Sequence, residues 1–94
     1  MEVKNHLRPS QSQMDEFLSG NNDNTIAMVN LLKFKEKAEY GDGRETNLTG
    51  AQAYAIYADE MLEHLSKVGA EPILGGGVSR LILGEVEELW DGVA

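Results

Sequence analysis

The sequence predicts a small α+β domain in which a strand, a helix and a second strand follow one another. Three observations predict it: an apolar run at 26–34, an apolar stripe at helical spacing from 54 to 68, and a glycine-interrupted apolar segment at 73–83. A chain of 94 residues forms a single domain, 1–94. Because so small a domain buries a limited share of its surface, a partner subunit would add stability.

The first 24 residues predict an N-terminal helical extension that precedes the main unit at 25–94. Ser10 follows Pro9 and is a candidate N-cap, and Met14, Phe17 and Leu18 form one apolar edge. The polar stretch SGNNDN, 19–24, then ends this helix.

Residues 26–34 form the strongest strand prediction, because both of their alternating faces are apolar. A sheet with water on one side shows apolar and polar residues in alternation instead. We therefore expect a central strand, covered by a helix on one face and by another element or a second chain on the other.

Asn30 interrupts this apolar run with a carboxamide. In one interpretation its amide orients a carbonyl or hydroxyl group of a small ligand in an apolar pocket. In the other, it is a structural group that bonds a neighbouring loop or a partner. The sequence leaves both open.

A polar loop at 40–50 leads into the main helix, and its glycines and length predict mobility and an approach to a ligand. Thr49 and Gln52 have capping-box spacing, and Gly69 is a candidate C-cap. The stripe between them consists of Tyr54, Tyr57, Ala58, Met61, Leu65 and Val68. Tyr54 and Tyr57 either pack against the sheet or offer a hydroxyl to a ligand, with Tyr57 preferred for that contact.

The second strand segment, 73–83, contains three consecutive glycines at 75–77, and we interpret it as an interrupted strand or tight hairpin. Pro72 predicts that it begins at a sheet edge. The glycines indicate a bulge or a close backbone approach, since no helix follows as a phosphate loop requires. Arg80 is a cation that could hold an acidic ligand or pair with Glu85, and Trp90 is a candidate rim aromatic or interface anchor.

Charge and composition exclude several classes. Sixteen acidic against eight basic residues give a net charge of −8, which repels nucleic acid and anionic membranes. The absence of cysteine excludes disulfides and thiolate sites and favours the cytoplasm. No apolar stretch reaches the roughly 20 residues of a membrane span. His64 near Glu60 is expected at the surface, because two ligands do not make a metal site, and no cofactor is expected.

Four motifs in order resemble an uncharacterised bacterial family, domain of unknown function 1330. They are MVNLLKF at 28–34, DGRE at 42–45, AYAIYAD at 53–59, and the glycine-rich strand with the late Trp90 and Asp91. The resemblance implies a ferredoxin-like βαββαβ unit that pairs into a dimeric α/β barrel and acts as a homodimer. Residues 25–94 would then be a truncated unit, since family members continue through a third strand, a second helix and a fourth strand.

In that truncated unit we expect the first and second strands to pair directly, or a partner chain to supply the missing ladder. The sequence shows no acid–base pair, which favours binding over chemistry. We expect a small-molecule site between sheet and helix or between subunits, with Asn30, Tyr54, Tyr57, Arg80 and Trp90 as candidate contacts. The alternative is a structural assembly module in which these residues only complete the core and the dimer.

Overall fold

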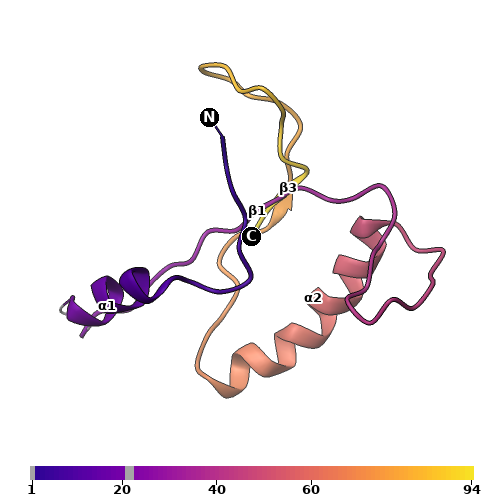
Figure 1. Ribbon diagram of the computed structural model, residues 1–94. Coiled ribbons are helices and arrows are strands. Elements are labelled where there is room, and N and C mark those ends of the chain that lie inside the picture. The colour runs from indigo at the N-terminus through magenta and orange to yellow at the C-terminus, as the bar shows by residue number, and fades with distance from the viewer. Residues whose placement is uncertain (1, 21–22) are drawn as a thin grey trace.

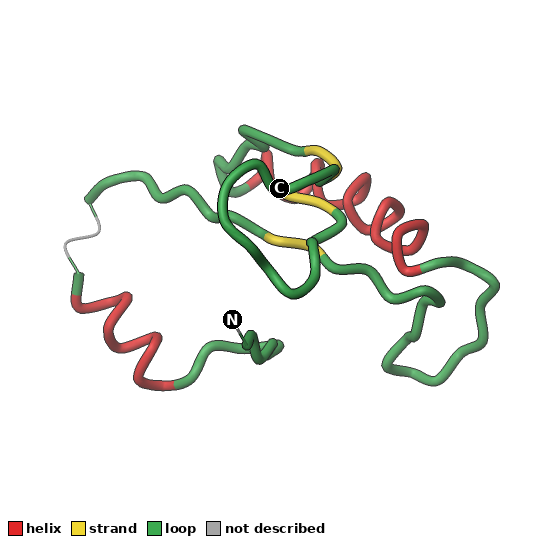
Figure 2. The backbone as a smooth tube through the Cα atoms, turned by 90° about the horizontal axis from the view of Figure 1, so that it is seen from above, coloured by secondary structure: helices red, strands yellow, loops and turns green. Residues whose placement is uncertain are grey.

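The computed structural model describes residues 2–20 and 23–94, and it has an α+β architecture. Two helices and three short strands follow one another along the chain (Figure 1). They are α1 (Gln11–Ser19), β1 (Leu31–Leu32), α2 (Gly50–Lys67), β2 (Gly76–Gly77) and β3 (Gly92–Val93). Helix α2 lies beside the sheet, and α1 lies apart from both in the two views (Figures 1 and 2).

The three strands form an antiparallel sheet in the order β1-β3-β2. Leu31 stands opposite Val93, and Val93 stands opposite Gly76. Asn30 and Ala94 extend the first ladder, because each backbone N–H donates to the other residue's carbonyl, at 2.7 and 3.0 Å.

This order corrects two expectations. The first and second strand segments do not pair directly, because β3 lies between them, so a third strand is present. The segment 26–34 is not central either, since β1 is an edge strand and β3 is the middle one. The physical reason is that β3 has backbone N–H and C=O groups on both of its edges. One edge pairs with β1 and the other pairs with β2.

The strands are also shorter than predicted. Of 26–34 only Leu31–Leu32 is a strand, and of 73–83 only Gly76–Gly77. A ladder extends only as far as its partner does, and β3 has two residues. Neither a longer interrupted strand nor a tight hairpin forms within 73–83, because β2 pairs with β3 instead, whereas the edge position predicted from Pro72 is confirmed for β2.

Both helices begin as the sequence predicts. Ser10 caps α1 and Thr49 caps α2, each in a complete capping box with Gln13 or Gln52. Gly69 ends α2 with a φ of 74°. The N–H of Gly69 bonds the Ser66 carbonyl and that of Ala70 the Leu65 carbonyl, which is a Schellman motif. The end predicted for α1 includes residues 21 and 22, which lie outside the described residues.

Little apolar surface is buried within this chain. Among the described residues, Ala38 at 9% exposure is the one buried hydrophobic side chain. The accessible surface is 8936 Å², whereas a folded protein of 10.3 kDa exposes about 5,400 Å². The radius of gyration is 16.0 Å, against about 12 Å for a compact domain of this length. The fold is therefore open.

Neither helix in the described part of the chain combines the length and apolar character that a bilayer crossing requires.

Candidate functional site

An apolar groove of about 340 Å³ lies between α2 and the sheet. Residues from four segments surround it, so it joins parts of the chain that are far apart in sequence. They are Leu32, Phe34, Tyr54, Ala58, Gly75, Gly76, Gly77, Asp91, Gly92, Val93 and Ala94. We call this site the groove.

Glycines of β2 and β3 form one side of the groove. A Cβ atom on Gly92 would lie 3.4 Å from the carbonyl oxygen of Gly76, which is a tight approach. Around Gly76 itself a Cβ would meet nothing within 4 Å. Gly76 therefore leaves bare backbone beside open space, where a flat molecule can lie against it, whereas Gly75, Gly77 and Gly92 each face a neighbouring carbonyl within 4 Å.

Aromatic rings form the opposite side. Tyr54 projects from α2, and its ring centroid lies 5.4 Å from that of Phe34 at an interplanar angle of 45°. The ring of Tyr57 follows at 5.6 Å from Tyr54, tilted by 49°. These are ordinary tilted aromatic pairs, and they hold the start of α2 against the strand segment that contains Phe34.

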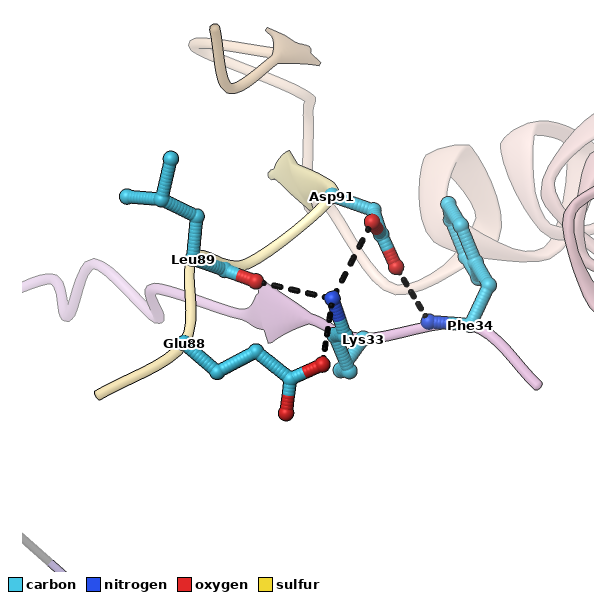
Figure 3. A network of polar contacts seen from close by, with 5 residues as sticks. All are labelled: Lys33, Phe34, Glu88, Leu89 and Asp91. Atoms are coloured by element: carbon cyan, nitrogen blue, oxygen red, sulfur yellow. Dashed lines mark hydrogen bonds and ion pairs between the residues drawn. The ribbon is translucent and has the colours of Figure 1, made fainter. Parts of the chain in front are cut away.

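Asp91 lines the groove and contacts the two residues that follow β1, Lys33 and Phe34 (Figure 3). The Phe34 N–H donates to Oδ2 of Asp91 at 2.7 Å, and the Lys33 ammonium lies 3.5 Å from Oδ1. Lys33 also donates to the Leu89 carbonyl at 3.0 Å and pairs with Glu88 at 3.1 Å. Asp91 directly precedes β3, and its side chain therefore connects the start of β3 with the residues that follow β1.

These contacts shift two pKa values. The hydrogen bond from the Phe34 N–H has the largest effect and lowers the pKa of Asp91; desolvation opposes it, and Lys33 lowers the pKa further. The hydrogen bond to Glu88 raises the pKa of Lys33, as does the charge of Asp91, while desolvation opposes them. Both groups are therefore held in their charged forms.

Of the five candidate residues from the sequence, Tyr54 lines the groove and the other four do not. Asn30 is exposed and pairs through its backbone with Ala94. Tyr57 is half exposed behind Tyr54. Arg80 is exposed in the connection between β2 and β3, and Trp90 is partly buried next to Asp91. The structure does not bring Asn30, Tyr57 and Arg80 together around this groove.

Sequence reasoning missed Asp91 and Phe34 as groove residues. A signal for Asp91 existed, because Lys33 ends the apolar run while the acidic tail supplies Glu88 and Asp91 as opposite charges. For Phe34 the sequence predicts a place on a strand face and indicates no partner ring.

The glycine loop after the first strand does not line the groove. It closes on itself through a hydrogen bond from the Ala38 N–H to the Leu48 carbonyl at 2.9 Å. The Arg44 guanidinium lies 3.9 Å from the centre of the Tyr40 ring, which braces the loop further. A second depression lies within this loop, between its two arms.

Within the described residues, no group of three or more histidine, aspartate or glutamate side chains could hold a metal ion. His64 is exposed near the end of α2, as expected.

Comparison of the chain with models of known protein families, with curated proteins and with solved structures finds no match.

Proposed function

We propose that this chain binds a small, largely apolar molecule in the groove between α2 and the sheet. The observation that supports the proposal most directly is the groove itself, with bare glycine backbone on one side and the Phe34 and Tyr54 rings on the other. Sites for small ligands in proteins are concave and mostly apolar, with a few placed polar groups. Asp91 is such a polar group here.

The proposal includes a second copy of the chain that covers the sheet and closes the groove. The chain exposes roughly 3,500 Å² more than a compact protein of its mass. Obligate homodimers bury about 1,000 to 2,500 Å² on each subunit, so the excess is sufficient for such an interface. Exposed apolar residues on the strand segments would supply it, among them Ile26, Met28, Val29, Ile73 and Leu74.

The proposed assembly is the dimeric α/β barrel of ferredoxin-like units that the resemblance to domain of unknown function 1330 implies. The strand order β1-β3-β2, antiparallel throughout and with α2 between β1 and β2, supports it, because the first three strands of a ferredoxin-like unit have this order. A cytoplasmic location belongs to the same proposal and is supported by the lack of cysteine.

A structural assembly module is the second candidate. It is favoured by the composition of the exposed apolar surface, since its large hydrophobic residues do not line the groove. In this case the second copy fills the groove with its own side chains.

Native mass spectrometry on protein purified without added ligand distinguishes the two candidates. We expect a dimer that carries an additional small mass. Ala58→Phe, which fills the groove from α2, should remove the extra mass, whereas Ala55→Phe on an exposed position of the same helix should keep it. A dimer that retains no extra mass, and whose groove residues show no change in NMR signals when small molecules are added, would establish the assembly module. A monomer would exclude the second copy.

A further inference from the structure

The chemistry around Asp91 restricts the class of ligand that the groove accepts. Lys33 is the nearest cation, and an ammonium group has three hydrogens to donate. Glu88, Leu89 and Asp91 lie within bonding distance of its nitrogen, at 3.1, 3.0 and 3.5 Å. Because two carboxylates and a carbonyl surround its nitrogen, the charge of Lys33 is already compensated, and an anionic ligand gains little from it.

Asp91, in contrast, keeps accepting capacity. A carboxylate has about four lone-pair positions, and the described contacts of Asp91 are the Phe34 N–H and the Lys33 ammonium. Its side chain is 40% exposed, so the remaining positions are reachable. The local cluster of Lys33, Glu88 and Asp91 has one positive and two negative charges and is therefore net negative.

The aromatic side of the groove and the net charge of the chain also favour a cationic ligand. The faces of the Phe34 and Tyr54 rings carry partial negative charge and attract a cationic group placed over them. The whole chain has a net charge of −8, which concentrates cations and repels anions around it.

From this geometry we infer that the groove binds a flat, ring-containing amine in its protonated form, with the ring against the glycine backbone and the ammonium on the Asp91 carboxylate. The inference rests on the proposed function, since it names the ligand class of the same groove.

Three probes of one shape test it: 1-naphthylmethylamine, 1-naphthalenemethanol and 1-naphthoic acid. Each is titrated at pH 7 into the full chain labelled with ¹⁵N, and the amide signals of Gly75, Gly76, Gly77 and Gly92 report on the groove. We expect the amine to bind up to about fivefold more tightly than the alcohol, because both can donate a hydrogen bond to the carboxylate and only the amine adds an exposed ion pair, and we expect the acid to bind most weakly.

Two variants distinguish a direct contact between Asp91 and the ligand ammonium from a general attraction by the negative charge of the chain. Asp91→Asn keeps the size of the side chain and an acceptor for the Phe34 N–H, and it should reduce the ratio of amine to alcohol affinity to about one. Glu88→Gln removes a neighbouring charge that does not line the groove, and it should leave the ratio near its original value.

The outcomes distinguish the inference from the proposed function. Equal binding of amine and alcohol, tighter binding of the acid, or an equal fall in the ratio for both variants would overturn the ligand class and leave groove binding intact. If none of the three probes shifts the glycine signals, both the ligand class and the proposed binding function are wrong.

Discussion

Asp91, near the end of the main unit, contacts residues near its beginning and lines the groove. Its carboxylate accepts the Phe34 N–H and lies near the Lys33 ammonium, 57 and 58 positions earlier in the sequence. This side chain adds to the backbone bonds that join the two segments, among them the bond from the Asp91 N–H to the Leu32 carbonyl at 2.7 Å.

The pKa of Asp91 predicts how this contact depends on pH. Because folding lowers this pKa, the contact stabilises the protein fully above the unfolded value of 3.8 and is lost as the pH falls through the folded value. We expect Asp91→Asn to lower the urea midpoint at pH 6 and to have a smaller effect at pH 3. Urea unfolding at both pH values, followed by circular dichroism, measures this difference.

Glu88→Gln is the control for this prediction. The Glu88 side chain is 74% exposed, and an ion pair this exposed contributes little to stability. Its urea midpoint should follow that of the unchanged protein at both pH values. An Asp91→Asn effect of equal size at pH 6 and pH 3 would contradict the role of the charged carboxylate.

The start of α2 shows how one element is positioned by another. The Gly50 N–H donates to the Lys35 carbonyl at 3.0 Å, so the first turn of the helix touches the backbone of the strand segment. A Cβ on Gly50 would lie 2.8 Å from the Lys35 nitrogen and closer still to its carbonyl oxygen. Only glycine permits this approach, which sets the position of α2 over the groove.

Gly50→Ala should therefore destabilise the protein by about 2 kcal/mol, as overpacking against a backbone does. Helix propensity alone predicts the opposite sign, a gain of about 1 kcal/mol. The free energy of unfolding from urea titration decides between them.

Gly41→Ala is the matched control, because a Cβ at Gly41 would meet nothing within 4 Å. It should leave the free energy of unfolding unchanged or raise it by about 0.5 kcal/mol through the unfolded state. A stabilised Gly50→Ala protein would show that α2 does not contact Lys35 in solution.

Helix boundaries could be predicted because their signals are local. Thr49, Gln52 and Gly69 define the ends of α2 through bonds to residues three to five positions away. The ends of α2 are accordingly where the sequence places them.

Strand pairing could not be predicted in the same way, since a strand needs a partner that no local pattern names. The apolar run at 26–34 indicates an extended segment, but its ladder depends on Gly92 and Val93, which resemble a tail in the sequence. The groove depends on that pairing, so Tyr54 was found from its helix stripe while Asp91 and Phe34 were not.

Because the whole molecule is open, a substitution at an exposed apolar position should have different effects in a single chain and in the proposed dimer. Val29 is 72% exposed and lies in the unpaired part of the predicted strand. In a monomer its replacement by a charged residue removes no buried contact, and such surface substitutions change stability by about 0.5 kcal/mol or less. In the proposed dimer, the same position is covered.

Val29→Asp should consequently weaken dimerisation by about tenfold or more, because a charge buried at an interface without a partner is costly. Sedimentation equilibrium over a range of protein concentrations measures the dissociation constant. Leu7→Asp is the control, since Leu7 is fully exposed in the N-terminal extension and lies outside the sheet. If Val29→Asp and Leu7→Asp leave the dissociation constant equally unchanged, the second copy does not cover the strand segment. The exposed apolar residues there would then need a different partner.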